Sequence, residues 1–372
     1  MPSVTYKKSK QKILHGINNL GRELEGFSKV MLVCGGSYHK LAISKVVESI
    51  DVQFVTFSGF RPNPSYDDIC EGVKLFRDER CEAILAVGGG SPMDVAKCIK
   101  LFSGMNDDAP YVEQPYEDTG IKLIAVPTTA GSGSESTRYA VIYYKGNKYS
   151  VHHDSIVPDV AVLEPSVLDN LPVYQKKCTM LDALCQAIEA WWSVNSTAES
   201  MKLSEAAVKE MMTWWRPYIF DYTPEAAQHV MEASNTAGRA INITQTTAAH
   251  AFSYKMTTLY GLPHGHAVAI GLPVIWQYMI DNIDATSDPR GKKHLQTVFS
   301  DIANAMGCDT PEQAIALFNN MLSEMGISSP KLNDTAELDI LAESVNPVRL
   351  KNNPVGITTE TAKELYSKII YS

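Results

Sequence analysis

The sequence predicts a protein of two domains, an α/β domain with a parallel sheet followed by an all-helical domain. At 372 residues the chain exceeds what one hydrophobic core usually accommodates. Short β-rich runs alternate with amphipathic stretches in the first half, whereas almost every segment after about Pro172 has helical periodicity. We therefore expect an α/β domain over residues 1–175 and a helical domain over residues 176–372.

The strands of the first domain are predicted from continuous apolar runs, which are typical of strands buried on both faces of a parallel sheet. These runs cover residues 30–36, 52–57, 83–87 and 123–126, and each ends in, or is directly followed by, glycine, serine or proline. Residues 139–151 alternate around Lys145-Gly-Asn147 and predict a β-hairpin. A further strand is expected at 160–163. Helical periodicity in the second half predicts helices over 178–192, 200–217, 224–243, 265–281, 292–306, 311–325, 336–345 and 358–370.

Composition restricts the partners and the compartment of the protein. A formal net charge of -9 argues against a general nucleic-acid-binding surface or a surface for acidic membranes. The seven cysteines are an odd number and are scattered without paired metal spacing, as in proteins of a reducing compartment. No apolar signal core or membrane-spanning run is present in the sequence. We expect a cytoplasmic protein with neither nucleic acid nor membrane as its partner.

Glycine-rich turns follow several of the predicted strands. Gly88-Gly-Gly-Ser91 comes directly after the run at 83–87 and opens a helix, where free backbone N–H groups attract phosphate. A second turn at 128–134 lies at the carboxyl end of another strand, the edge where parallel sheets bind ligands. Such glycines can also serve only as tight connections, but two turns of this kind together favour a cofactor site. The expected cofactor-binding residues are Gly35, Gly36, Ser37, Gly88, Gly89, Gly90, Ser91, Asp94, Thr128, Thr129, Ser132, Ser134 and Lys148.

Candidate metal ligands occur in the helical half. Asp182 and Gln186 are four residues apart in a helical pattern, so their side chains lie on one face. His250 and His264 offer imidazole nitrogens from a second element. Each residue alone is more often structural, but a carboxylate, two imidazoles and an amide oxygen form a ligand set typical of a catalytic metal site.

These motifs resemble the iron-containing (group III) alcohol dehydrogenase family over nearly the whole chain. The resemblance is carried by residues 88–94, by 127–135, by Pro158-Asp159 with Asp182, and by His250 spaced fourteen residues from His264. It implies a dinucleotide-binding first domain and a helical second domain that binds one divalent metal, Fe2+ or Zn2+. Asp182, His250 and His264 match the metal ligands of the family.

Two positions depart from the pattern of the family. Gln186 stands where most members carry a histidine, and its neutral amide oxygen is a weaker donor than imidazole. The site would then bind metal through three strong ligands, with Gln186 as a weak fourth, or bind it weakly. Tyr254 stands where many relatives have a histidine near the nicotinamide, and a packing role for it is as open as a catalytic one. Tyr254 and His266 are the expected catalytic side chains.

Residues 182–197, 263–269 and 349–355 resemble the phosphonoacetaldehyde reductase branch of the family. The resemblance implies an oxidoreductase that reduces a small aldehyde, phosphonoacetaldehyde, to the primary alcohol 2-hydroxyethylphosphonate. A phosphonate dianion needs a local cluster of cations in an acidic protein. Arg349 and Lys351, in a loop-like stretch between two helices, and Arg138, after the second glycine-rich turn, are the candidates.

The cofactor is expected to be NADPH or NADH. The turn at 33–40 lacks the acidic residue that selects NAD, and Ser37, His39 and Lys40 there favour a 2′-phosphate. The alternatives are a generic short-chain alcohol or diol dehydrogenase, a dehydroquinate synthase-like lyase, and a metal-poor nucleotide-binding protein. A homo-oligomer is expected.

Overall fold

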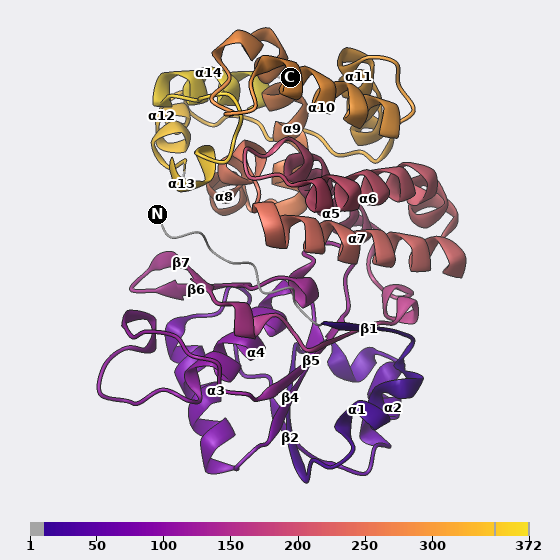
Figure 1. Ribbon diagram of the computed structural model, residues 1–372, viewed down its shortest axis with the longest axis vertical. Coiled ribbons are helices and arrows are strands. Elements are labelled where there is room, and N and C mark those ends of the chain that lie inside the picture. Colours follow the sequence, from indigo (N-terminus) through magenta and orange to yellow (C-terminus); the bar gives the residue numbers. More distant parts are fainter. Residues whose placement is uncertain (1–10, 346, 371–372) are drawn as a thin grey trace. The chain divides into compact units, whose positions relative to one another are not determined.

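The structure is a computed structural model that describes residues 11–345 and 347–370. The chain divides into two compact units, Met1–Leu171 and Pro172–Ser372, coloured indigo to magenta and magenta to yellow in Figure 1. The division falls just before the long helix that opens the second unit. An α/β unit and a helical unit are what the sequence predicts, so the fold class is confirmed.

The first unit is built on a six-stranded parallel sheet with the strand order β1-β8-β5-β4-β2-β3. Its strands are β1 (Lys12–His15), β2 (Lys29–Cys34), β3 (Gln53–Phe57), β4 (Ala83–Gly88), β5 (Lys122–Pro127) and β8 (Val160–Leu163). Five of these strands coincide with the predicted ones, namely β2, β3, β4, β5 and β8. The short edge strand β1 was not predicted, because only its two middle residues are apolar and partly buried, so it forms no continuous apolar run.

Helices cover the sheet on both faces. Figure 1 shows α1 (Leu20–Leu24) and α2 (Ile43–Glu48) to one side of the sheet and α3 (Tyr66–Asp78) and α4 (Gly90–Phe102) to the other. The predicted hairpin is present as the antiparallel pair β6 (Tyr139–Tyr144) and β7 (Asn147–His152). The core between the sheet and α3 and α4 is aliphatic and aromatic, which accounts for the apolar runs.

The strand order places a topological switch in this unit. After β2 the chain adds β3 on one side and β4 on the other, so the order reverses between β2 and β4. In open parallel sheets a crevice forms at this point outside the carboxyl ends of the strands, and ligands bind there. The glycine-rich turns at 35–37 and 88–91 follow these two strands.

The second unit is entirely helical. Its helices are α5 (Val173–Trp192), α6 (Ala198–Arg216), α7 (Pro224–Thr244), α8 (Ala248–Tyr260), α9 (His264–Asp281), α10 (Lys292–Ala305), α11 (Pro311–Glu324), α12 (Ala336–Glu343), α13 (Pro347–Leu350) and α14 (Thr359–Ile370). Two of them were not predicted. The first turns of α8 are buried on every side, so no amphipathic period marks the helix. The short helix α13 replaces part of the loop expected at 348–354.

Helix α5 lies at the centre of this unit and packs against α6, α7 and α9. All of its residues from Met180 to Trp192 are buried. Polar side chains on this stretch are therefore removed from water and need partners from neighbouring helices.

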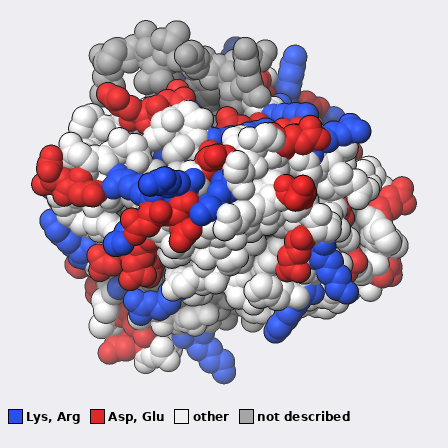
Figure 2. Space-filling view, turned by 90° about the horizontal axis from the view of Figure 1, so that it is seen from below, with Lys and Arg blue, Asp and Glu red and all other residues white. Residues whose placement is uncertain are grey.

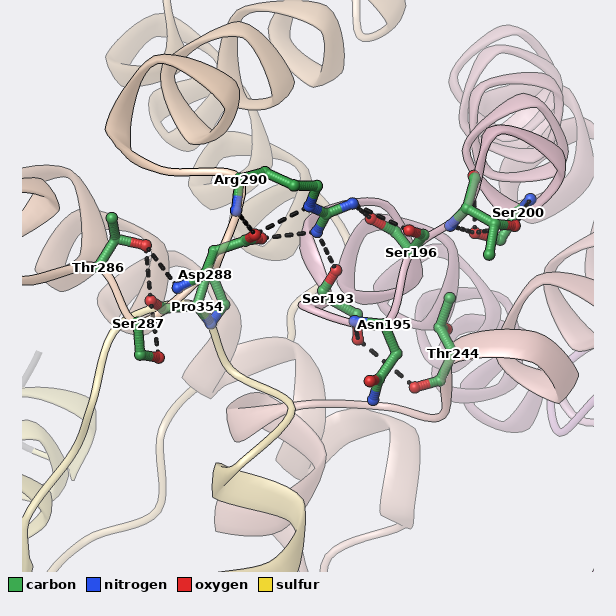
Figure 3. A network of polar contacts seen from close by, with 11 residues as sticks. Ser193, Asn195, Ser196, Ser200, Thr244, Thr286, Ser287, Asp288, Arg290 and Pro354 are labelled. Carbon is green, nitrogen blue, oxygen red and sulfur yellow. Dashed lines mark hydrogen bonds and ion pairs between the residues drawn. The ribbon is translucent and has the colours of Figure 1, made fainter. Parts of the chain in front are cut away.

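A polar network connects the end of α5 to two later segments (Figure 3). Arg290 forms an ion pair with Asp288 at 2.6 Å and donates to the carbonyl oxygens of Ser193 and Ser196, both at 2.9 Å. Thr286 donates to the carbonyl oxygen of Pro354 at 2.9 Å. The network thus holds together the loop after α5, the loop before α10 and the stretch after α13.

The surface view in Figure 2 shows acidic and basic side chains interspersed over the face that it presents. Among the described residues, none of the helices combines the length and the apolar character needed to cross a membrane.

Candidate metal centre

Three of the predicted ligands converge in the second unit. Asp182 on α5, His250 on α8 and His264 at the start of α9 each place a ligand atom within 4.8 Å of those of the other two. Asp182 and His250 are buried, and His264 is partly buried. One carboxylate and two imidazoles at this spacing are a donor set that fits Zn2+ or Fe2+.

The imidazole of His250 is oriented by two carboxylates. Its Nδ1 contacts Oε2 of Glu189, and its Nε2 lies 3.2 Å from Oδ1 of Asp182. Burial opposes the imidazolium, but the negative charges of Glu189 and Asp182 outweigh it and raise the pKa of His250 to about 9. In the metal-free protein both nitrogens of His250 thus carry protons, with Nδ1–H donated to Glu189 and Nε2–H to Asp182, and a shared cation would take the place of the Nε2 proton.

Glu189 is a functional residue that the sequence analysis missed. Its side chain is fully buried, and its Oε1 accepts hydrogen bonds from Thr247 Oγ1 and the Ala249 amide, both at 2.8 Å. The His250 amide also donates to Oε1, at 3.3 Å. Glu189 follows Asp182 by seven residues on α5, two helical turns on the same face, and this spacing is the signal that could have identified it.

His264 is oriented by Ser253. The Ser253 hydroxyl donates to the carbonyl oxygen of His250 at 2.8 Å, so its oxygen accepts from Nδ1 of His264 at 3.2 Å. Nε2 is then the nitrogen of His264 that would bind a cation, as in His250. The two imidazole rings meet edge to face with their centroids 5.4 Å apart.

Gly265 permits the close approach of α9 to α5. A Cβ at this position would lie 1.9 Å from the carbonyl oxygen of Cys178 and 2.8 Å from Cβ of Asp182. No side chain fits there without separating the two helices. Glycine beside His264 is therefore a condition for bringing its imidazole to Asp182.

Gln186 is buried one turn after Asp182 on α5, on the face predicted from the sequence. Its coordination of a metal ion stays a prediction.

Tyr254 and Arg349 lie beside this cluster. The ring of Tyr254 stacks parallel to that of His264, with 5.7 Å between centroids and 6° between planes. Burial raises the pKa of Tyr254, partly offset by the positive charge and the hydrogen bond of Arg349. A phenol in this setting stays protonated at neutral pH and is a hydrogen-bond donor.

The structure favours a structural role for His266 over the predicted catalytic one. Its Nε2 donates to the carbonyl oxygen of Ser328 at 2.9 Å, and its Nδ1 accepts from the Tyr174 hydroxyl at 2.8 Å. Burial lowers the pKa of His266, so the ring is neutral with both nitrogens occupied. It connects the start of α5 to the chain after α11.

The three cations predicted to bind substrate differ in their surroundings. Arg349 is partly buried on α13, whereas Lys351 is exposed. Arg138 lies in the first unit, where its guanidinium forms an ion pair with Asp154 at 2.6 Å. This pairing gives Arg138 a structural role in its own unit, and its contact with substrate stays a prediction.

The predicted cofactor turns come together at the carboxyl ends of the strands. The Thr128 amide donates to the carbonyl oxygen of Gly88 at 2.9 Å, next to the paired ends of β4 and β5. A Cβ on Gly89 would lie 3.5 Å from Thr129, and one on Gly90 would lie 3.8 Å from Ser132. The turns at 88–91 and 128–134 are thus adjacent. The turn with Gly35, Gly36 and Ser37 follows β2 at the topological switch, and Ser91 accepts from the Asn63 amide at 3.4 Å.

Lys97 and Asp94 both bond to Ser134 and so support the second of these turns. Lys97 donates to Ser134 Oγ at 2.9 Å and to Thr137 Oγ1 at 3.0 Å, and Ser134 Oγ donates to Asp94 at 3.2 Å. Burial raises the pKa of Asp94 to about 6 and lowers that of Lys97 to about 8. Asp94 therefore holds Ser134, and its part in cofactor binding stays a prediction. Lys148, exposed on β7, contributes a positive charge that favours the ionised form of Asp94.

A doubly wound unit with glycine-rich turns and a helical unit with a buried Asp-His-His cluster together define a metal-dependent oxidoreductase. The family model of iron-containing alcohol dehydrogenases matches residues 11–165, and that of the C-terminal domain of the Fe-containing alcohol dehydrogenase family matches residues 177–370. The chain belongs to the iron-containing alcohol dehydrogenase family, whose members use NAD(H) and a metal ion.

The chain is similar to several proteins of this family. A phosphonoacetaldehyde reductase from Streptomyces viridochromogenes is 32% identical over 314 residues, covering 80% of this chain and 79% of that protein. A 1,3-propanediol dehydrogenase from Klebsiella pneumoniae is 28% identical over 330 residues, covering 82% and 81%. An iron-containing alcohol dehydrogenase structure from Thermococcus thioreducens has a TM-score of 0.86 at 25% identity, covering 98% and 99%. The predicted resemblance to the phosphonoacetaldehyde reductase branch is confirmed.

Proposed function

We propose that the protein reduces phosphonoacetaldehyde to 2-hydroxyethylphosphonate with NADPH or NADH. The similarity to a phosphonoacetaldehyde reductase supports the branch, and the surroundings of Arg349 support the anionic substrate. Arg349 donates through Nη1 to the amide oxygen of Gln245 at 2.8 Å. In the described part of the chain no carboxylate forms an ion pair with it, whereas Arg138 and Arg290 are paired with aspartates. Arg349 is therefore a cation held by a neutral acceptor, and this observation carries the proposal.

The position of Arg349 connects it to the chemistry of the site. Arg349 lies beside Tyr254, and Tyr254 stacks on His264, one of the three candidate ligands. A phosphonate bound by Arg349 would leave the aldehyde end of a two-carbon substrate in the region of Asp182, His250 and His264. A guanidinium binds phosphonate oxygens in a bidentate manner, which fixes the orientation of the substrate.

The residues of the chain have separate parts in the reaction. Asp182, His250 and His264 would hold a divalent cation, which supplies Lewis acidity toward an aldehyde oxygen when bound. The adjacent turns at 88–91 and 128–134 would bind the pyrophosphate of the nicotinamide cofactor, which supplies a hydride when bound. Tyr254, kept protonated by burial, donates a hydrogen bond to the substrate oxygen. Asp182 and His250 are buried among the helices around α5, which limits their contact with water.

A generic alcohol or diol dehydrogenase is the second candidate, because relatives such as the 1,3-propanediol dehydrogenase share the same two domains. Steady-state turnover of aldehydes with and without a phosphonate group, with both reduced cofactors, distinguishes the two. Net oxidation of the cofactor excludes a synthase-like lyase, which regenerates its NAD.

The test of the proposal compares kcat/KM for phosphonoacetaldehyde and propionaldehyde in the wild type and in Arg349→Ala. One charge-assisted contact contributes roughly 1.5–3 kcal/mol, so the substitution should lower efficiency on the phosphonate about tenfold or more. Efficiency on propionaldehyde should stay nearly unchanged. Arg239→Ala, at an exposed position of α7, is the matched control. Equal wild-type efficiency on both aldehydes would refute the phosphonate assignment, and Lys351→Ala shows whether the exposed neighbour contributes.

A further inference from the structure

We propose that Gln245 is a specificity-determining positioning residue, which holds Arg349 through a neutral amide and so leaves its positive charge available for the anionic group of the substrate. The inference rests on the proposed function. It concerns a residue that lies between α7 and α8 and that the sequence analysis did not single out.

The side chain of Gln245 is the junction of a network of amides. Its Oε1 accepts from Nη1 of Arg349 at 2.8 Å and from Nδ2 of Asn352 at 3.3 Å. Asn352 is buried, donates also to the carbonyl oxygen of Thr246 at 3.1 Å, and accepts through Oδ1 from Asn195 at 3.0 Å. Arg349 is thereby fixed in direction through groups that carry no net charge.

The backbone of Gln245 is an independent sign of a constrained position. Its φ of 60° and ψ of 176° belong to a region that residues other than glycine rarely adopt. The conformation is held by the Gln245 amide, which donates to Ile241 at 2.8 Å, and by Thr244 Oγ1, which donates to the Gln245 carbonyl oxygen at 2.8 Å. A conformation of this kind persists where surrounding contacts over-determine it, and such positions cluster at functional sites. Here it directs the amide at Arg349.

The choice of an amide over a carboxylate has an electrostatic consequence. Glutamate has nearly the same shape as glutamine, and the two groups that contact Oε1 are donors, so a glutamate at this position would form an ion pair with Arg349. The pair would cancel the charge that attracts a dianion, because two unit charges at this spacing interact strongly near a protein surface. Arg290, in the same unit, is an example of an arginine whose charge is paired in this way, by Asp288.

The experiment measures kcat/KM for phosphonoacetaldehyde and propionaldehyde with the metal-loaded protein in the wild type and in Gln245→Glu. The variant should lose at least about tenfold in efficiency on the phosphonate, mainly through KM, and stay within about twofold of the wild type on propionaldehyde. Gln228→Glu adds the same charge at an exposed position of α7 and should leave both efficiencies unchanged.

Gln245→Gly adopts the positive φ without strain and removes the amide, so it tests the positioning role in a variant that keeps the local backbone. It should lose part of the phosphonate preference with no fall in the thermal midpoint. A wild type that prefers the phosphonate, with both Gln245 variants keeping that preference, overturns the inference and leaves the proposed function intact. A wild type without the preference refutes the proposed function, and the inference falls with it.

Discussion

The substitution Glu189→Gln tests how the candidate metal centre is oriented. Oε1 of Glu189 accepts from Thr247, from the Ala249 amide and from the His250 amide, so the NH2 group of a glutamine cannot occupy that side. The NH2 group must then take the place of Oε2 and face Nδ1 of His250. To accept from it, the imidazole must move its proton from Nδ1 to Nε2. The lone pair that a cation at Asp182 requires is thereby lost.

The expected loss of metal affinity follows from the contribution of carboxylates that hold ligating histidines. Removing the partner of a ligating histidine typically weakens metal affinity 10–100-fold, which corresponds to roughly 1.4–2.8 kcal/mol. The upper end is expected here, because the change forces the wrong tautomer and does not merely weaken a hydrogen bond. The free energy of unfolding of the metal-free protein should change less than the metal affinity.

The assay is a titration of metal-free protein with Zn2+ against a chromophoric chelator, combined with nitrogen NMR of the His250 ring. Glu164→Gln is the matched control, since Glu164 accepts from the backbone amides of Ile17 and Ser166 in the first unit. A Glu189→Gln protein that binds Zn2+ within about threefold of the wild type, with Nδ1 of His250 still protonated, would refute the reasoning.

Three further outcomes are expected. His264→Ala should abolish turnover and metal content together, measured by steady-state kinetics and elemental analysis, and retention of both would show that the site is misassigned. Gly265→Ala should lower metal occupancy severely while the fold persists, because its Cβ would meet the carbonyl oxygen of Cys178 at 1.9 Å; unchanged occupancy would contradict the close-approach argument. NADPH should be accepted at least as readily as NADH, because the exposed turn at 36–40 presents Ser37, His39 and Lys40 and no carboxylate of its own; a strong kinetic preference for NADH would count against this.

The sequence was sufficient for most of the fold because its signals there are local. Parallel strands buried on both faces appear in the sequence as continuous apolar runs. The amphipathic helices of the second unit appear as apolar residues repeated at helical spacing. Helix α8 was missed because its first turns are buried on all sides and have no polar face to mark a period. Strand β1 was missed because only its pairing with β8, distant in the sequence, makes it a strand.

The candidate site was predicted only in part, because the sequence alone does not show which distant residues come into contact. The spacing of Asp182, His250 and His264 identified three residues that the structure brings together. Glu189 was missed because its role depends on the segment around Thr247 folding onto α5. The ion pair of Arg138 with Asp154 depends on tertiary contacts within the first unit, so the sequence alone could not separate this cation from Arg349.

Anomalous X-ray diffraction at the zinc or iron edge, from crystals of the metal-loaded protein, tests the central claim most directly. The account predicts one strong peak bonded to a carboxylate oxygen of Asp182 and to Nε2 of both His250 and His264, with Nδ1 of the two rings still donated to Glu189 and Ser253. A peak at another position, or coordination through Nδ1 of either histidine, would contradict it.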